Sequence, residues 1–328
     1  MDNDYIPRNA RSQDVLARLL ARLWHGSAPL TATGLLMIAA LAIAVGGLLI
    51  DPRTITGAPA WLKPAKFAVS ITIYTFTLAW IFSLVPDWVR TRRLVEWTTA
   101  IVMVLEVVII DLQAIRGIPS HFNVGTVFDG VLFTTMGAAI ATQTLSTIAV
   151  AVALWRERLP DRALGWALRL GMIITIVGAM TGGLMTRPTD AQLTAARAGE
   201  RMLIAGAHTV GAPDGGAGLP GTGWSTEHGD LRVAHFVGLH ALQVLPVIAL
   251  LLRRTRVNTL ARVRLTVTAA VSYASLFVIL LTQALRGQSL LTPDSVTWTM
   301  LGVWAVAVAL AAAAVSYRRQ PMQRTVVV

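Results

Sequence analysis

The chain has 328 residues, of which 55% are hydrophobic and only 14% are charged, and its mean hydropathy of +0.62 excludes an ordinary soluble domain. Its net charge of +11 comes from basic residues in short clusters between apolar runs, a pattern typical of membrane topology and not of nucleic-acid binding. Cysteine is absent, which excludes disulfides, thiolate nucleophiles and iron–sulfur clusters, so a bound metal or haem would need nitrogen, oxygen or methionine ligands.

Residues 1–29 are predicted to form a cytoplasmic tail that carries a short amphipathic helix. The stretch SQDVLARLLARLW, residues 12–24, places its leucines on one helical face and Arg18 and Arg22 on another. We expect this helix to lie along the membrane surface. Because a polar segment precedes the first apolar run, we expect an uncleaved anchor and not a cleaved signal peptide.

Residues 30–317 are predicted to be an all-α, polytopic transmembrane bundle, followed by a cytoplasmic tail at 318–328. A bilayer core takes roughly 20 apolar residues per helix. Eight stretches reach that length, at about 30–50, 67–85, 95–115, 127–154, 163–186, 231–252, 262–285 and 295–317. Most arginines then lie in the tails and in the loops on one side. The positive-inside rule therefore predicts that both termini lie in the cytoplasm. We expect the membrane to be the inner membrane of a bacterium.

The chemically unusual segments fall on the outer side of this topology. The motif WLKPAKF contributes Trp61, Lys63 and Lys66. These side chains are expected to anchor the chain at the membrane interface, or to form a basic rim that attracts anionic head groups or substrates.

The longest outer loop, 187–230, divides into two parts by composition. Its first part, up to His208, is predicted to be a helix capped by Thr189 or Asp190. The part that follows is rich in glycine and proline, which oppose regular structure. This loop is either a flexible linker or a lid over the outer mouth of the bundle, with Trp224 packing back onto the helices.

Ionisable residues lie inside two predicted spans at matching depths. With a rise of ~1.5 Å per residue, His235 and Asp111 lie roughly 6–7 Å below the outer surface, and His240 and Glu106 roughly 13–15 Å below it. Charged groups at such depth face the bundle interior and need a partner. If the third and sixth spans are adjacent, His235 pairs with Asp111 and His240 with Glu106.

Other polar residues of the outer layer are expected to bind substrate or to extend this network. They are Gln113, Asn123, Asp129, Asp230, Arg232 and Gln243. Gln113 is predicted to extend the hydrogen bonds of Glu106, and Gln243 those of His240.

Five of the six histidines fall on the predicted outer side, which suggests a metal or haem site. Neutral imidazole is a common metal ligand, and His121, His208, His235 and His240 are the candidates. Zinc, iron, copper or a b-type haem would fit such ligands. His235 and His240 are five residues apart, about 140° around a helix, so they cannot both face one ion.

Two alternatives to a metal or haem site stay open. The first is a structural hydrogen-bond network between helices, without any ligand. The second is a path for a substrate or a proton in which Glu106, Asp111 and the histidines relay protons, as in a proton-coupled transporter of small molecules. An enzyme that performs redox or hydrolytic chemistry on a membrane-soluble or lipid substrate would instead use the metal or haem. Composition leaves the oligomeric state open.

The strings HTVGAPDGGAGLPGTGWST and GDLRVAHFVGLHALQ, together with WLKPAKF and PSHFN, resemble a set of uncharacterised bacterial multi-pass membrane proteins. The resemblance covers most of the chain and implies a multi-pass fold, but no activity.

A more distant resemblance is to the membrane hydrolases typified by alkaline ceramidases and progestin/adipoQ receptors, which hold zinc with three histidines supported by a serine and an aspartate. Ser120, His121, Asp129, His235 and His240 follow that inventory in chain order. The late histidines of that family are four residues apart and these are five, and the serine here adjoins the first histidine. Both departures put the zinc chemistry in doubt.

Overall fold

The computed structural model describes residues 8–85 and 87–317, which form α-helices joined by loops and two short antiparallel strand pairs. The helical fold class predicted from the sequence is confirmed. By its packing the chain divides into two compact units, with the boundary between Ala153 and Leu154.

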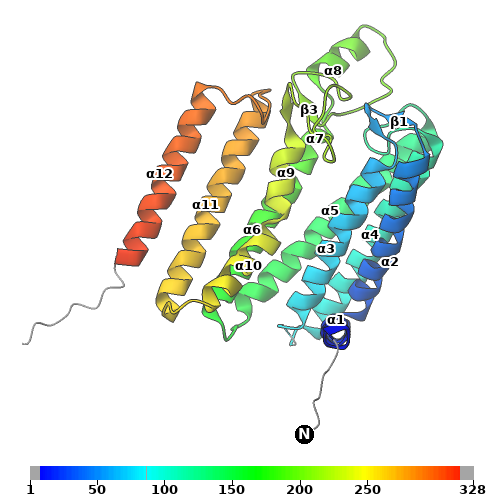
Figure 1. The fold of residues 1–328 in the computed structure, drawn as a ribbon. Helices are drawn as coiled ribbons and strands as arrows, with labels where there is room; N and C mark the ends of the chain where they lie inside the picture. The colour runs from blue at the N-terminus through cyan, green and yellow to red at the C-terminus, as the bar shows by residue number, and fades with distance from the viewer. Residues whose placement is uncertain (1–7, 86, 318–328) are drawn as a thin grey trace, which may run out of the picture. The chain divides into compact units, whose positions relative to one another are not determined.

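The first unit contains the N-terminal helix and the first four predicted spans. Its elements are α1 (Arg8–Gly26), α2 (Ala28–Ile50), β1 (Thr54–Ile55), β2 (Ala58–Pro59), α3 (Leu62–Phe82), α4 (Val89–Arg116) and α5 (Val127–Arg156), whose last turn crosses the boundary. In Figure 1, α1 is seen end-on at the lower ends of α2, α3 and α4, which run up the page. It therefore lies across the direction of the spans, as a surface helix does.

Buried apolar and polar side chains hold α2, α3 and α4 together. Their shared core is formed by Met37, Ile71, Val102, Met103 and Val107. The start of α2 is fixed by Ser27, whose hydroxyl accepts from the backbone N–H of Leu30 at 3.4 Å and donates to Glu96 of α4 at 2.7 Å.

The second unit contains the remaining spans and the long outer loop. Its elements are α6 (Arg162–Met180), α7 (Gly182–Met185), α8 (Asp190–Arg197), β3 (Thr209–Val210), β4 (Gly229–Asp230), α9 (Leu231–Leu239), α10 (Ala241–Arg253), α11 (Thr259–Leu285) and α12 (Ser295–Tyr317). α6, α10 and α11 share a core rich in alanine, which lets the helices approach closely.

The predicted sixth span, 231–252, is not one continuous helix. It is broken at His240 into α9 and α10, whose directions differ by 45°. Pro246 lies inside α10 and removes one further backbone hydrogen bond, because proline has no N–H. The predicted span is present as this bent pair of helices, and its break was not predicted.

The helices have the length and surface of membrane spans. Within the described residues seven helices are long and apolar enough to cross a bilayer, or eight if the bent pair α9 and α10 counts as one span. Large apolar side chains lie on the outside, as Leu49 and Ile50 show with 81% and 83% of their surface exposed. An apolar exterior is unfavourable in water and suits contact with lipid, which indicates a transmembrane protein.

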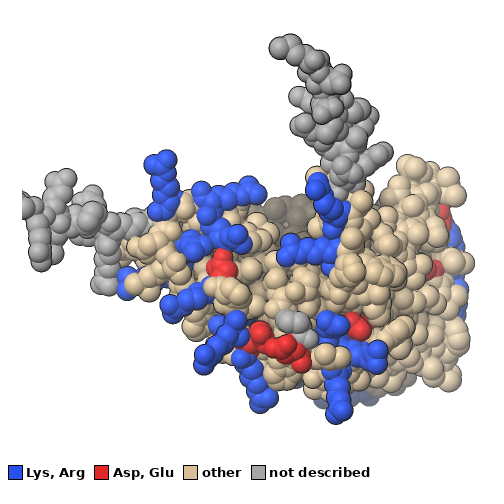
Figure 2. All heavy atoms as spheres, turned by 90° about the horizontal axis from the view of Figure 1, so that it is seen from below, with Lys and Arg blue, Asp and Glu red and all other residues tan. Residues whose placement is uncertain are grey.

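Basic side chains gather at one end of each unit, the end seen from below in Figure 2. In the first unit, the first turn of α4 contains Arg90, Arg92 and Arg93. It lies close to the hydrogen bond between Glu96 and Ser27, the residue that follows α1. In the second unit, the carboxylate of Asp161 at the start of α6 forms ion pairs with the guanidinium groups of Arg253 and Arg262, each at 3.6 Å. Arginine clusters that the sequence analysis assigned to the cytoplasmic side thus share an end within each unit.

Candidate functional site

α4 carries two carboxyl groups inside its membrane-spanning length. Glu106 is 1% exposed, and neither of its carboxylate oxygens has a hydrogen-bond partner among the described residues. Asp111 is half-buried, and its Oδ1 atom likewise has no partner in the described part of the chain. The positive charge of Lys63 acts electrostatically on Glu106. Removing a carboxylate from water costs several kcal/mol, so a group placed like Glu106 is a candidate for binding a proton or a cation.

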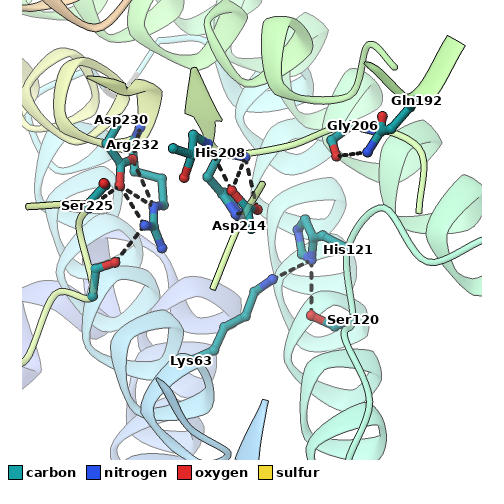
Figure 3. Close-up of polar contacts among 12 residues, drawn as sticks. Lys63, Ser120, His121, Gln192, Gly206, His208, Asp214, Ser225, Asp230 and Arg232 are labelled. Carbon is teal, nitrogen blue, oxygen red and sulfur yellow. Dashed lines mark hydrogen bonds and ion pairs between the residues drawn. The ribbon is translucent and has the colours of Figure 1, made fainter. Parts of the chain in front are cut away.

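A polar cluster with Lys63 lies where α3 begins and α4 ends. Lys63 donates to Nδ1 of His121 at 3.0 Å, and the Ser120 hydroxyl lies 3.1 Å from the same nitrogen (Figure 3). Because an ammonium group can only donate, Nδ1 is the acceptor and the ring proton of this neutral histidine is on Nε2. Phe67 contacts the imidazole ring, and the next residue, Phe122, is buried with a φ of 65°. A buried non-glycine residue in the left-handed region is a strained backbone, and such strain gathers at functional sites.

Asp129 is the centre of a polar network where α5 begins. It accepts from Gln113 at 3.0 Å, from Arg116 at 2.5 Å and from the hydroxyl of Thr126 at 2.6 Å. Arg116 thus forms an ion pair with Asp129. The predicted hydrogen bond from Gln113 to Glu106 is wrong, because Gln113 lies two turns further along α4 and is engaged by Asp129 and Arg116.

Trp61, directly before α3, is held by a hydrogen bond to the carboxylate of a surface ion pair. Its indole N–H donates to Asp51 at 2.9 Å, and Arg53 also binds that carboxylate and reaches the carbonyl oxygen of Ile115 at 3.0 Å. The hydrogen bond from Arg53 holds the pKa of Asp51 well below its usual range. Lys66, in the first turns of the same helix, is half-buried.

The two histidines of the sixth span have separate surroundings. Nδ1 of His235 donates to the carbonyl oxygen of Gly178 at 2.8 Å and lies 3.2 Å from the hydroxyl of Thr181, so α9 is tied to the end of α6. His240 occupies the break itself and hydrogen-bonds Gln243, as the sequence predicted. The His235 ring thus contacts α6, whereas the His240 ring packs against Phe236 with 4.2 Å between ring centroids.

Side chains of neighbouring helices satisfy the backbone at this break. The hydroxyl of Tyr273 in α11 donates to the carbonyl oxygen of Val237 at 2.6 Å, and Thr175 in α6 donates to that of Leu239 at 3.2 Å. Sequence reasoning missed both residues, although Pro246 inside an apolar run was a signal that this helix is irregular.

The outer loop is ordered by contacts of its own. α8 begins with the predicted cap at Thr189, which forms a capping box with Gln192, but the helix ends at Arg197 and does not reach His208. Gly199, with a φ of 89°, directs the chain out of the helix. His208 instead bonds Asp214 through Nδ1 at 2.6 Å and through its backbone N–H at 3.0 Å (Figure 3).

The end of the loop is fastened to the start of α9. Asp230 is buried, caps this helix, binds Arg232 at 2.6 Å and accepts from the backbone N–H of Ser225 at 2.8 Å (Figure 3). Trp224 packs edge-on against Phe236 of α9, with 5.6 Å between ring centroids. The predicted packing of Trp224 onto the helices is found, while the role of the loop as a lid or a linker stays a prediction.

The predicted metal site is not supported, and the haem site stays a prediction. Within the described residues no three His, Cys, Asp or Glu side chains come together in a way that could hold a metal ion. Each candidate histidine instead has protein contacts, namely His121 with Lys63, His208 with Asp214, His235 with Gly178 and His240 with Gln243.

Several predicted site residues fall into different units. Asp111 and Glu106 belong to the first unit, and His235 and His240 to the second, so their pairing stays a prediction. Asn123 has a local role, since its side-chain oxygen accepts from the backbone N–H of Gly125 at 3.0 Å.

Comparison with known proteins leaves the family open. No protein-family model, curated protein or solved structure matches the chain.

Proposed function

We propose that the protein is a multi-pass carrier of the bacterial inner membrane that couples proton movement to the transport of a small molecule, with Glu106 as the proton-binding group. The observation that carries this proposal is the burial of Glu106, whose two carboxylate oxygens have no hydrogen-bond partner among the described residues. A carboxyl group kept only for structure would be hydrogen-bonded, because an unsatisfied buried group costs stability.

The chemistry of a coupled carrier follows from the two charge states of Glu106. Protonated, the side chain is neutral and fits an apolar surrounding. Deprotonated, it is an uncompensated charge except for the field of Lys63. A group whose two states differ so strongly in environment links proton binding to a change of conformation, since each state favours a different arrangement.

The broken span supports the same proposal from the second unit. Discontinuous helices are tolerated at membrane depth where they are buried in protein or line a cavity, and transporters use them to bind solutes and ions. Here the break places His240 between α9 and α10, and the carbonyl groups of the preceding turn are held by Thr175 and Tyr273.

The orientation belongs to the proposal as well. The basic end of each unit would face the cytoplasm and the loop 187–230 would face outward. The Lys63–His121 cluster and the loop would then meet solutes that arrive from outside.

The proposal is tested by transport into proteoliposomes that contain a trapped pH-sensitive dye. Small carboxylates, amines, amino acids and sugars are added in turn, and internal acidification is recorded. We expect one class of solute to drive proton entry in the wild type. Glu106→Gln should abolish that proton entry, because a glutamine amide does not bind a proton near neutral pH.

Glu227→Gln is the matched control, because it removes an exposed carboxylate from the outer loop. It should retain the flux of the wild type. Folding of all variants is checked by thermal unfolding in detergent. Proton entry that persists in Glu106→Gln would contradict the proposal, and so would a well-folded wild type that moves protons with none of the solute classes.

A further inference from the structure

α1 is an integral part of the first unit and not a loose tail. It lies across the lower ends of α2, α3 and α4 (Figure 1). Leu23 is buried there, and Ser27, directly after the helix, donates to Glu96 of α4 at 2.7 Å. The helix is thus fixed at the end of the membrane-spanning helices, where the basic face of Figure 2 lies.

The apolar side of α1 is wider than the part that the unit covers. At about 100° per residue, its apolar residues occupy roughly half of the helix circumference. Leu20 and Leu23 are covered at least in part. More than half of the surface is exposed at Val15, Leu16, Leu19 and Trp24. In water this stripe would be an unfavourable apolar patch, whereas at a membrane surface it can enter the lipid.

Arginines border this stripe, and three more lie at the start of α4. Arg18 and Arg22 lie beside it on α1, and both are exposed. Arg90, Arg92 and Arg93 follow on α4, near the Ser27–Glu96 hydrogen bond. The Nε atom of Arg92 is buried and has no hydrogen-bond partner among the described residues, and Asp87 adds one exposed negative charge to the same stretch.

We propose that α1 and the first turn of α4 form a binding surface for the anionic phospholipids of the membrane. The apolar stripe would enter the acyl region, while Arg18, Arg22 and Arg92 bind the phosphate groups beside it. Basic residues near an anionic bilayer are attracted by its negative surface potential. A soluble phosphate could occupy the arginines but would leave the stripe exposed, so the combination selects a lipid surface.

The absence of cysteine in the chain allows a direct test of the depth of α1. A nitroxide is attached to Leu19→Cys in the full-length protein, which is reconstituted into vesicles of phosphatidylcholine with or without phosphatidylglycerol. Collision with oxygen, which enters lipid, is compared with collision with a water-soluble nickel chelate. We expect phosphatidylglycerol to raise oxygen collision and to lower nickel collision.

Charge variants show whether the arginines cause this change. Arg18→Gln with Arg22→Gln, in the same labelled background, should bring the label back to the accessibility seen without phosphatidylglycerol. Arg187→Gln with Arg197→Gln is the matched control. These two exposed arginines follow the C-terminal end of α6, whereas the arginine cluster of that unit lies at the N-terminal end of α6. This control should retain the effect of the lipid, and all variants should unfold at the temperature of the labelled parent in detergent.

Three results would overturn the proposal. The first is a label that is equally accessible to nickel in both kinds of vesicle. The second is a label that keeps its response to phosphatidylglycerol in the Arg18→Gln, Arg22→Gln variant. The third is an equal response to inorganic phosphate added to phosphatidylcholine vesicles, which would assign the arginines to a soluble anion and not to the bilayer.

Discussion

At the scale of single residues, Gly178 joins two helices and a histidine. A Cβ atom at this position would lie 2.6 Å from backbone atoms of Gly238 in α9, which is too close for any side chain. The carbonyl oxygen of Gly178 also accepts from His235 at 2.8 Å and from Thr181 at 2.6 Å. One residue thus sets the distance between α6 and α9 and the orientation of the imidazole.

Gly178→Ala should therefore lower the stability of the second unit. Overpacking of a close contact costs about 1–3 kcal/mol, because the backbones must separate, and separation also lengthens the His235 hydrogen bond. Thermal unfolding of the purified protein measures the loss. Gly165→Ala, on the same helix, is the control. A Cβ atom there meets its neighbours at 3.5–3.8 Å, an ordinary contact distance, so that variant should unfold like the wild type or slightly higher. Equal unfolding temperatures for the two variants would show that the close approach is not needed.

At the scale of elements, the outer loop is held by a charged carboxylate. Burial raises the pKa of Asp214. The hydrogen bond and charge of His208, together with the backbone N–H groups of His208 and Thr209, lower the pKa by more than burial raises it, so that it lies well below the ordinary value of 3.8. The folded pKa is below the unfolded one. Asp214 therefore contributes stability that is complete above about pH 4 and is lost as the pH falls through the folded pKa.

Asp214→Asn should show this dependence. Above about pH 4 the variant should unfold at a lower temperature than the wild type, and the difference should shrink as the solution is acidified below that range, because the wild-type carboxylate then takes up a proton. Unfolding curves of both proteins over a pH series measure the difference. Glu200→Gln, which removes an exposed carboxylate from the same loop, controls for the loss of charge alone. A difference that stayed constant down to the lowest pH would contradict the role given to the Asp214 carboxylate.

The same loop shows what sequence can and cannot predict at this scale. The cap at Thr189 was predictable, because a threonine three residues before a glutamine is a local pattern. The end of α8 at Arg197 was not, because the residues that follow favour a helix and are held instead by contacts distant in sequence, such as that of Gln192 with Gly206 at 3.0 Å. His208 was consequently assigned to the wrong element, and its partner Asp214 went unrecognised.

At the scale of the whole molecule, hydropathy located the helices because each span must be long and apolar on its own account. The break at His240 depends on Tyr273 and Thr175, which come from two other helices, and no local pattern announces such a contact. The same holds for Lys63 and His121, which lie 58 residues apart in sequence and meet at one end of the first unit. Which helices are neighbours decides the site, and periodicity carries no information about that.

The distribution of charge predicts the orientation of the chain in the membrane. The basic end of each unit resists translocation, so Thr255, in the arginine-rich turn after α10, should face the cytoplasm and Ala217, in the outer loop, should face outward. Ala217→Cys and Thr255→Cys each introduce the single cysteine of the chain. A membrane-impermeant maleimide should label Ala217→Cys in intact spheroplasts and Thr255→Cys after the membrane is opened, while the cysteine-free parent stays unlabelled. The reverse pattern would invert the orientation and place the outer loop on the cytoplasmic side.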